Sequence, residues 1–176
     1  WTIISTAPAC PAATTLVAVA DAWIDQNSRS NNKGTDSILK IQSKGPSDNF
    51  RTLVRFSLPP GMQGCIVESA TLRLYAASNK TGRTLQAIRL AAGWSENVVT
   101  WNNQPQTTGP AVTTSSGFGY REWNVSSQVQ AMYDGAANDG FLIRDAVENA
   151  DAEQQFHSRE KGENPPQLVL RFAGAS

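Results

Sequence analysis

Oxygen-bearing side chains gather in the first quarter of the chain, where they could bind a hard metal ion. Asp21 and Asp25 share one side of an extended run, and Asp36 follows in the polar stretch behind it. Carboxylate and carbonyl oxygens are the ligands that Ca²⁺ takes, in flexible geometry. Asp21, Asp25 and Asp36 are therefore candidate ligands of a structural calcium. The alternative is that they form local turns, and the acidic run at 145–153 allows the same two interpretations.

Residues that could catalyse a reaction are few. His157 is the single histidine of the chain, it lies in a predicted strand, and no G-x-S-x-G turn supplies a nucleophile. Glu96, Glu122 and Glu160 lie on or beside predicted strands and could act in pairs on a glycosidic bond, but the sequence does not give their separation. We expect no enzymatic activity, with a polysaccharide lyase or glycoside hydrolase as the weakest of the functions considered.

Arginines recur on one side of several predicted strands, opposite the inward-facing residues: Arg51, Arg55, Arg73 and Arg171. Tyr75 shares the side of Arg73. If the strands are neighbours, a stripe of guanidinium groups crosses one sheet face, and its forked geometry suits the carboxylates of uronic-acid polymers. The alternative is that the arginines pair with glutamates of the same chain in ordinary surface salt bridges.

Tryptophans are the other candidates for carbohydrate contact, because the apolar face of a pyranose ring matches the plane of an indole. Trp94 and Trp101 are seven positions apart, so in an extended strand they point to opposite faces, one toward the core and one outward. Trp23 faces away from Ala22 and Ile24. We expect Trp23 and Trp101 to be available to a ligand, although large aromatic side chains are mostly buried in sandwiches.

The elements that must position these side chains are short strands. Alternating runs separated by turn residues predict an all-β fold, a two-sheet antiparallel β-sandwich of the jelly-roll type with about ten strands. The predicted strands cover residues 16–24, 38–42, 51–56, 69–76, 84–91, 98–101, 120–123, 140–145, 154–159 and 167–172. One short helix is predicted, with Asn124 or Ser126 as its cap, Val125, Val129 and Met132 on one face, and Gly135 at its end. Loops are predicted at 25–36, 104–119 and 145–153.

Composition limits the partners. The 15 basic and 15 acidic residues of the 176-residue chain cancel, so no overall positive field recruits nucleic acid or an anionic membrane. No basic segment followed by a long apolar run is present at either end, so we expect no membrane span. A chain of this length forms one domain, predicted at residues 16–176 behind an N-terminal extension at 1–15.

Several segments together resemble a known family, in one order and without a large gap: residues 20–25, 51–56, 69–75, 94–105, 140–144, 156–160 and 164–170. They resemble the DNRLRE domains, which include the family 96 carbohydrate-binding modules and the disaggregatase-related repeats. The resemblance covers roughly Leu16 to Phe172. It implies a β-sandwich module attached to secreted or cell-surface proteins, and it does not by itself imply an enzyme.

The function that this resemblance implies is a non-catalytic carbohydrate-binding or adhesive module. Its partner is then a polysaccharide or cell-surface glycan, acidic if the arginine stripe exists, and other domains or subunits of a larger surface protein are further partners. The alternative is a structural module that spaces or assembles a surface protein or fibre without binding sugar. That alternative predicts salt-bridged arginines and buried tryptophans.

The two cysteines, Cys10 and Cys65, match no metal-ligand spacing. In an exported protein of the kind that the resemblance implies, a disulfide is favoured over two free thiols. Such a bond would tie the N-terminal extension to the sandwich.

Overall fold

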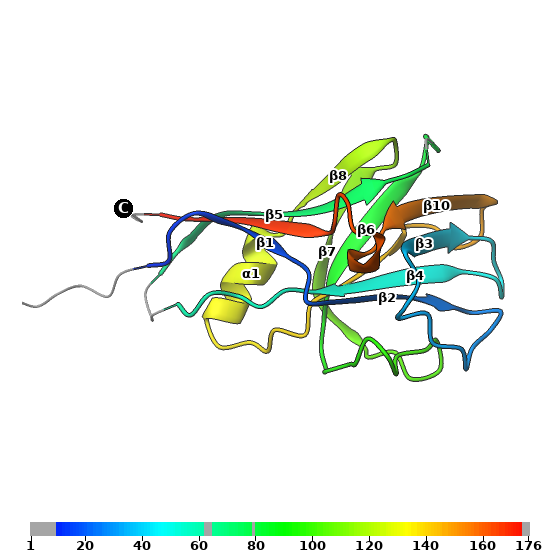
Figure 1. The fold of residues 1–176 in the computed structure, drawn as a ribbon, viewed down its shortest axis with the longest axis horizontal. Helices are drawn as coiled ribbons and strands as arrows, with labels where there is room; N and C mark the ends of the chain where they lie inside the picture. The colour runs from blue at the N-terminus through cyan, green and yellow to red at the C-terminus, as the bar shows by residue number, and fades with distance from the viewer. Residues whose placement is uncertain (1–9, 62–64, 79, 174–176) are drawn as a thin grey trace, which may run out of the picture.

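The computed structural model describes residues 10–61, 65–78 and 80–173 (Figure 1). Eleven strands, one α-helix and one 3₁₀ helix are found in these residues. The strands are β1 (Thr14–Val17), β2 (Ala20–Asp25), β3 (Ile38–Ser43), β4 (Phe50–Arg55), β5 (Val67–Ala76), β6 (Thr84–Leu90), β7 (Thr107–Ser115), β8 (Gly119–Asn124), β9 (Phe141–Asp145), β10 (Ala152–His157) and β11 (Gln167–Phe172). The helices are α1 (Ser126–Tyr133) and η1 (Arg159–Lys161). No helix among the described residues has the length and apolar character needed to cross a membrane.

All strand pairs are antiparallel and form two layers. The first sheet contains β1, β11, β5 and β8, and the second contains β2, β4, β9, β6 and β7. The antiparallel pair β10 and β3 connects them, because β10 bonds to β5 at Phe156 and β3 bonds to β4 at Gln42. The expected all-β sandwich with one short helix is confirmed.

The main core lies between the two sheets and follows the alternation of the strands. Leu72 and Leu74 of β5, Val54 of β4 and Phe141 of β9 are buried together in one cluster. Their neighbours in sequence face the opposite side, as the two-residue period requires. Trp123 closes the core from β8, and its indole N–H donates to the Leu85 carbonyl at 3.0 Å.

A second, smaller apolar cluster lies on the outer face of the second sheet. It contains Ile24, Leu53 and Leu142, together with Ala22, Leu90 and Val99. Residues 91–106, which we call the covering segment, lie over it, and Trp94 and Trp101 both pack against this cluster. The outer face of the second sheet is therefore closed to solvent where the covering segment lies.

Helix α1 docks against β5 at the end of the sandwich near the C-terminus (Figure 1). The side chains of Gln130 and Ser126 accept hydrogen bonds from the backbone N–H groups of Val67 and Ala70, at 2.7 and 3.0 Å. A disulfide joins Cys10 to Cys65. The expected disulfide is thus confirmed, and it ties the chain ahead of β1 to the residues that enter β5.

Three predicted elements differ from the structure. Residues 98–101 form turns, because the side chain of Asn103 bonds to Thr100 N and Val98 O and closes the chain on itself. Residues 107–115, predicted as loop, form strand β7, which pairs with β6 and with no other described strand. The predicted strand 16–24 divides into β1 and β2, which join different sheets. Residues 1–9 of the predicted N-terminal extension lie outside the described residues. The predicted boundary between this extension and the domain, at residue 16, stays a prediction.

Candidate functional site

The predicted arginine stripe is divided between the two sheets. Arg51 and Arg55 belong to β4, whereas Arg73 belongs to β5, and β10 and β3 separate these strands in the sheet order. The stripe was expected only if the strands are neighbours, and β4 and β5 do not meet this condition. The two groups of candidates therefore have different surroundings.

Arg51 and Trp101 form part of the covered outer face of the second sheet. The Arg51 guanidinium lies 4.4 Å from the centre of the Trp101 ring and binds Glu148 through two hydrogen bonds of 3.0 and 2.7 Å. A third bond, of 3.0 Å, goes to the Gln104 side chain. This arrangement holds the covering segment to β4, so neither side chain is free for a ligand.

Trp23 and Arg55 are also unsuited to a flat binding surface. Trp23 is 5% exposed, its N–H donates to Asp36 at 3.0 Å, and Phe50 packs on it with ring centres 4.9 Å apart. The expectation that Trp23 faces outward was wrong, since the side of β2 opposite Ala22 faces β3 and not solvent. Arg55 is half-buried, and its Nε atom is buried without a hydrogen-bond partner.

Arg73 and Tyr75 lie on a face that remains uncovered, the outer side of β1, β11, β5 and β8. We call this surface the open face. Its cross-strand rows place Arg73 between Glu122 of β8 and Gln167 of β11. Arg73 Nε donates to Glu122 at 3.0 Å, and the guanidinium lies 3.9 Å from the centre of the Tyr120 ring.

An aromatic cluster occupies one end of the open face. Tyr75 is at its centre, with ring-to-ring distances of 5.9 Å to Phe118, 5.2 Å to Tyr120 and 4.8 Å to His157. Phe118 is 62% exposed, whereas His157 is buried and its Nδ1 lies 3.1 Å from the Glu163 carbonyl. His157 is thus fixed in a packing role. The sequence did not reveal Phe118 or Tyr120 as site residues, because Phe118 lies in the predicted loop 104–119 and Tyr120 is the first residue of the predicted strand 120–123.

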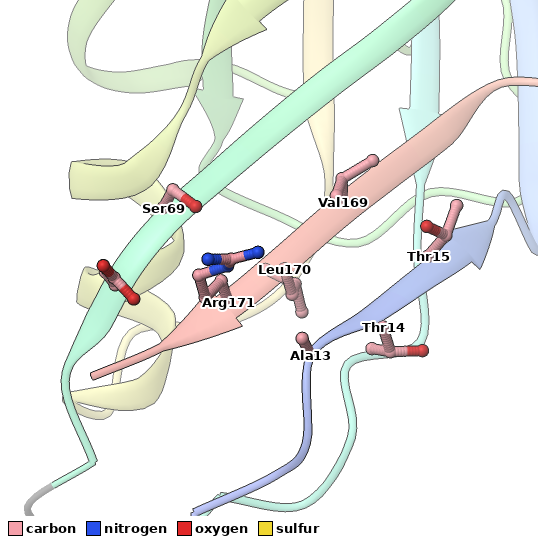
Figure 2. A pocket seen from close by; sticks show the side chains of 8 residues that line it. Ala13, Thr14, Thr15, Ser69, Val169, Leu170 and Arg171 are labelled. Carbon is pink, nitrogen blue, oxygen red and sulfur yellow. The ribbon is translucent and has the colours of Figure 1, made fainter. Parts of the chain in front are cut away.

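A groove marks the other end of the open face. It has a volume of about 640 Å³ and is lined by residues of β1, β5 and β11: Ala13, Thr14, Thr15, Glu68, Ser69, Val169, Leu170 and Arg171. Figure 2 shows the Arg171 side chain at the end of β11, between Ser69 of β5 and the start of β1. Among the described residues, no acid lies within ion-pair distance of Arg171.

An acidic cluster lies apart from the open face, where β2, the covering segment and η1 meet. Carboxylate oxygens of Asp21, Glu96 and Glu160 all lie within 4.8 Å of one another, the only such group of three among the described residues. The pKa of Asp21 is raised from 3.8 to about 8, mainly because burial disfavours the charged carboxylate. The Arg159 N–H lowers this pKa, and the charges of Glu160 and Glu96 raise it.

The other predicted calcium ligands have different partners. Asp25 accepts a hydrogen bond from Asn27 N at 2.8 Å, and Asp36 accepts bonds from Ile38 N and Trp23, both at 3.0 Å. The bonds from Asn27 N and Ile38 N are the turn-forming contacts of the alternative interpretation. Of Asp21, Asp25 and Asp36, the structure places only Asp21 in the acidic cluster.

Three of the four acids in the run at 145–153 pair with basic side chains of the same chain. Asp145 binds Arg83 through two hydrogen bonds, Glu148 binds Arg51, and Glu153 lies 3.7 Å from Lys40. Of the three glutamates considered for hydrolysis, Glu96 and Glu160 meet in the acidic cluster. No local signal indicated that meeting, since they come from segments far apart in the sequence and only the fold joins them.

Comparison with known proteins identifies the family. The model of carbohydrate-binding module family 96 matches residues 12–172, nearly the whole chain. A search of curated proteins finds no match. The match agrees with the family 96 resemblance of the sequence segments and with the observed sandwich. The chain therefore belongs to carbohydrate-binding module family 96.

Proposed function

We propose that this chain is a non-catalytic module that binds polysaccharide through the open face of the first sheet. The observation that carries the proposal is the cluster of Tyr75, Tyr120 and the exposed Phe118 beside Arg73 on that face. Aromatic rings of this kind offer an apolar plane to the C–H face of a sugar. The covering segment makes the outer face of the second sheet unsuitable for the same role.

The dimensions of the open face suit an extended chain. Ser69 beside the groove and Tyr75 in the aromatic cluster are six residues apart on β5, which corresponds to about 20 Å. A polysaccharide lying along β5 would contact Phe118 at one end and Arg171 at the other. Arg171 supplies a guanidinium for a sugar carboxylate, so we propose acidic polysaccharides, such as alginate or pectin, as the preferred ligands.

We further propose that the module acts outside the cell, in a secreted or cell-surface protein. The disulfide between Cys10 and Cys65 supports this location, because disulfides persist in oxidising compartments.

Affinity electrophoresis tests the proposed function. Migration is compared in gels that contain alginate, pectin or a neutral glucan. We expect retardation by the acidic polymers and a clear loss of it in Phe118→Ala and Arg171→Ala, both exposed positions where folding is not at stake. Arg29→Ala, which removes the same charge from the exposed β2–β3 loop, is the matched control and should behave like wild type.

The salt dependence of retardation separates the contributions of Arg171 and Phe118 to the affinity. The Debye length falls from about 10 Å at 0.1 M to 3 Å at 1 M, so the share of affinity that depends on Arg171 should weaken with salt. The share that depends on Phe118 should persist. Equal retardation of wild type and both variants, or none with any polymer, would contradict the proposed surface.

One observation favours a second candidate, a structural module that spaces or assembles a surface protein. Arg51 and Arg73 are paired with Glu148 and Glu122 of the same chain, as that alternative predicts. Absence of retardation by every polysaccharide at low salt would favour this candidate.

A further inference from the structure

The acidic cluster joins three segments that are distant in the sequence. Asp21 N donates to Glu96 Oε1 at 3.0 Å across 75 positions, and Arg159 N donates to Asp21 Oδ2 at 2.8 Å across 138 positions. Glu160 completes the group from η1. The cluster is therefore a point at which β2, the covering segment and the β10–β11 connection are held together.

Side-chain hydrogen bonds fix the backbone at Glu96 and Glu160. Asn32 donates from its side chain to the Glu96 carbonyl at 2.8 Å, which fixes the backbone of the covering segment there. Ser158 accepts a hydrogen bond from Glu160 N at 3.1 Å and donates to the Asp36 carbonyl at 2.6 Å, which fixes the start of η1. The three carboxylates thus converge from a preformed frame.

Asp21 has an unsatisfied oxygen inside this frame. The residue is 1% exposed, and its Oδ1 atom is buried with no hydrogen-bond partner. A buried carboxylate oxygen without a hydrogen-bond donor destabilises the fold, because it has lost its hydration and gained no partner in exchange. Since the same side chain lies in the group of three converging carboxylates, a cation among them would satisfy this oxygen.

The guanidinium of Arg159 does not neutralise the charge of the acidic cluster. Arg159 lies 3.2 Å from both carboxylate oxygens of Glu96 and 3.8 Å from Glu160. One guanidinium faces three carboxylates. It is also 38% exposed, and no contact to the Asp21 carboxylate from its side chain is found among the described residues.

We propose that Asp21, Glu96 and Glu160 bind a calcium ion that fastens β2, the covering segment and η1 together. The donor set contains oxygen only, which suits Ca²⁺ and not the softer transition metals that prefer imidazole or thiolate. His157, the one imidazole of the chain, is engaged with Tyr75 and the Glu163 carbonyl. The part-exposed Glu160 leaves one side accessible to water, which completes the coordination of calcium in many sites.

Calcium titration of the chelated protein tests the site directly. A ligand that binds the native state alone raises the melting temperature in a dose-dependent way. We expect half-saturation at about 10⁻⁴–10⁻³ M, the range of extracellular calcium modules. Terbium, an ion of similar size and charge preference, should show luminescence sensitised by tryptophan, and calcium should displace it.

Variants identify the ligands. Glu160→Gln keeps the size of an accessible side chain and removes its charge, so it should require at least tenfold more calcium for the same shift. Asp21→Asn should lose the shift while keeping a cooperative melting transition. Glu163→Gln changes an exposed acid three positions from Glu160 and is the matched control, expected to bind like wild type.

Three results would overturn the proposal. The first is no melting shift and no terbium signal in the wild type at about 10 mM calcium, well above the expected range. The second is an equal shift from sodium chloride at matched ionic strength, which would reduce the effect to screening. The third is unchanged calcium binding in both Glu160→Gln and Asp21→Asn, which would place the ion elsewhere.

Discussion

The contact between Gly34 and the covering segment offers a sharp test of how this fold is held together. A Cβ atom added at Gly34 would lie 2.7 Å from the carbonyl carbon of Glu96 and closer still to its oxygen. The optimal separation of two carbon atoms is about 3.5–4.0 Å, so Gly34→Ala must push two backbones apart by about 1 Å. The two closest atoms belong to the backbone of Glu96, so movement of a flexible side chain cannot relieve the clash.

The expected loss of stability follows from the bonds at this contact. Asn32 donates to the carbonyls of Glu96 and Val99, both at 2.8 Å, and a displacement of about 1 Å breaks bonds of this length. Two lost hydrogen bonds cost about 1 kcal/mol each, and overpacking adds about 1–3 kcal/mol. Gly34→Ala should therefore lower the free energy of unfolding by about 3–5 kcal/mol.

Urea unfolding followed by tryptophan fluorescence measures this loss. Gly93→Ala is the matched control, because a Cβ there meets only a carboxylate oxygen of Asp139, at 3.6 Å, and the change should stay within about 0.5 kcal/mol of wild type. Similar stability of the Gly34 and Gly93 variants would refute the reasoning. Loss of the calcium effect in the Gly34 variant is also expected, since the same displacement moves Glu96.

Three further changes have predictable costs in stability. Replacing Cys10 and Cys65 with serine opens a link across 55 positions and should lower the free energy of unfolding by about 4 kcal/mol, measured by urea titration; an unchanged midpoint would contradict this. Arg83→Ala leaves the buried Asp145 without its two-pronged partner and should cost about 3 kcal/mol by the same assay. Lys40→Ala removes a more exposed pair and should cost under about 1 kcal/mol; equal costs for the two would show that burial does not matter here.

Alternation of apolar residues was sufficient to predict most of the sandwich. Strands such as β5 and β11 alternate buried and outward-facing side chains along their length, which is the pattern that a period of two detects. β7 escaped detection because it is an edge strand with little buried surface, rich in threonine and interrupted by Gly109 and Pro110. Proline is tolerated at an edge, where its missing N–H removes no ladder bond.

The candidate site was less predictable, because it depends on which strands become neighbours. Parity correctly placed Arg73 and Tyr75 on one side of β5, but it could not show that Arg51 lies on the other sheet beneath the covering segment. Parity also assumes an extended strand, so it failed for Trp94 and Trp101, which lie outside the strands and pack on the same apolar cluster.

The acidic cluster was beyond the reach of local patterns. The expectation of calcium ligands was confined to one stretch of sequence, in which Asp25 and Asp36 instead close turns. Glu96 and Glu160 reach Asp21 only after the sandwich has formed. Calcium binding itself stays a prediction.

The disulfide has a consequence for how the module bears mechanical load. Tension applied at Cys10 and at Ala173 passes through the sulfur atoms directly into β5, whose first residue Val67 pairs with Phe172 of β11. The covalent path of the load therefore bypasses strands β1 to β4 while the bond is intact. Reduction of the disulfide would open the loop between Cys10 and Cys65, which spans 55 positions. The opened segment would add roughly 190 Å of extensible chain. The bond thus sets the maximum length to which the domain can be drawn out.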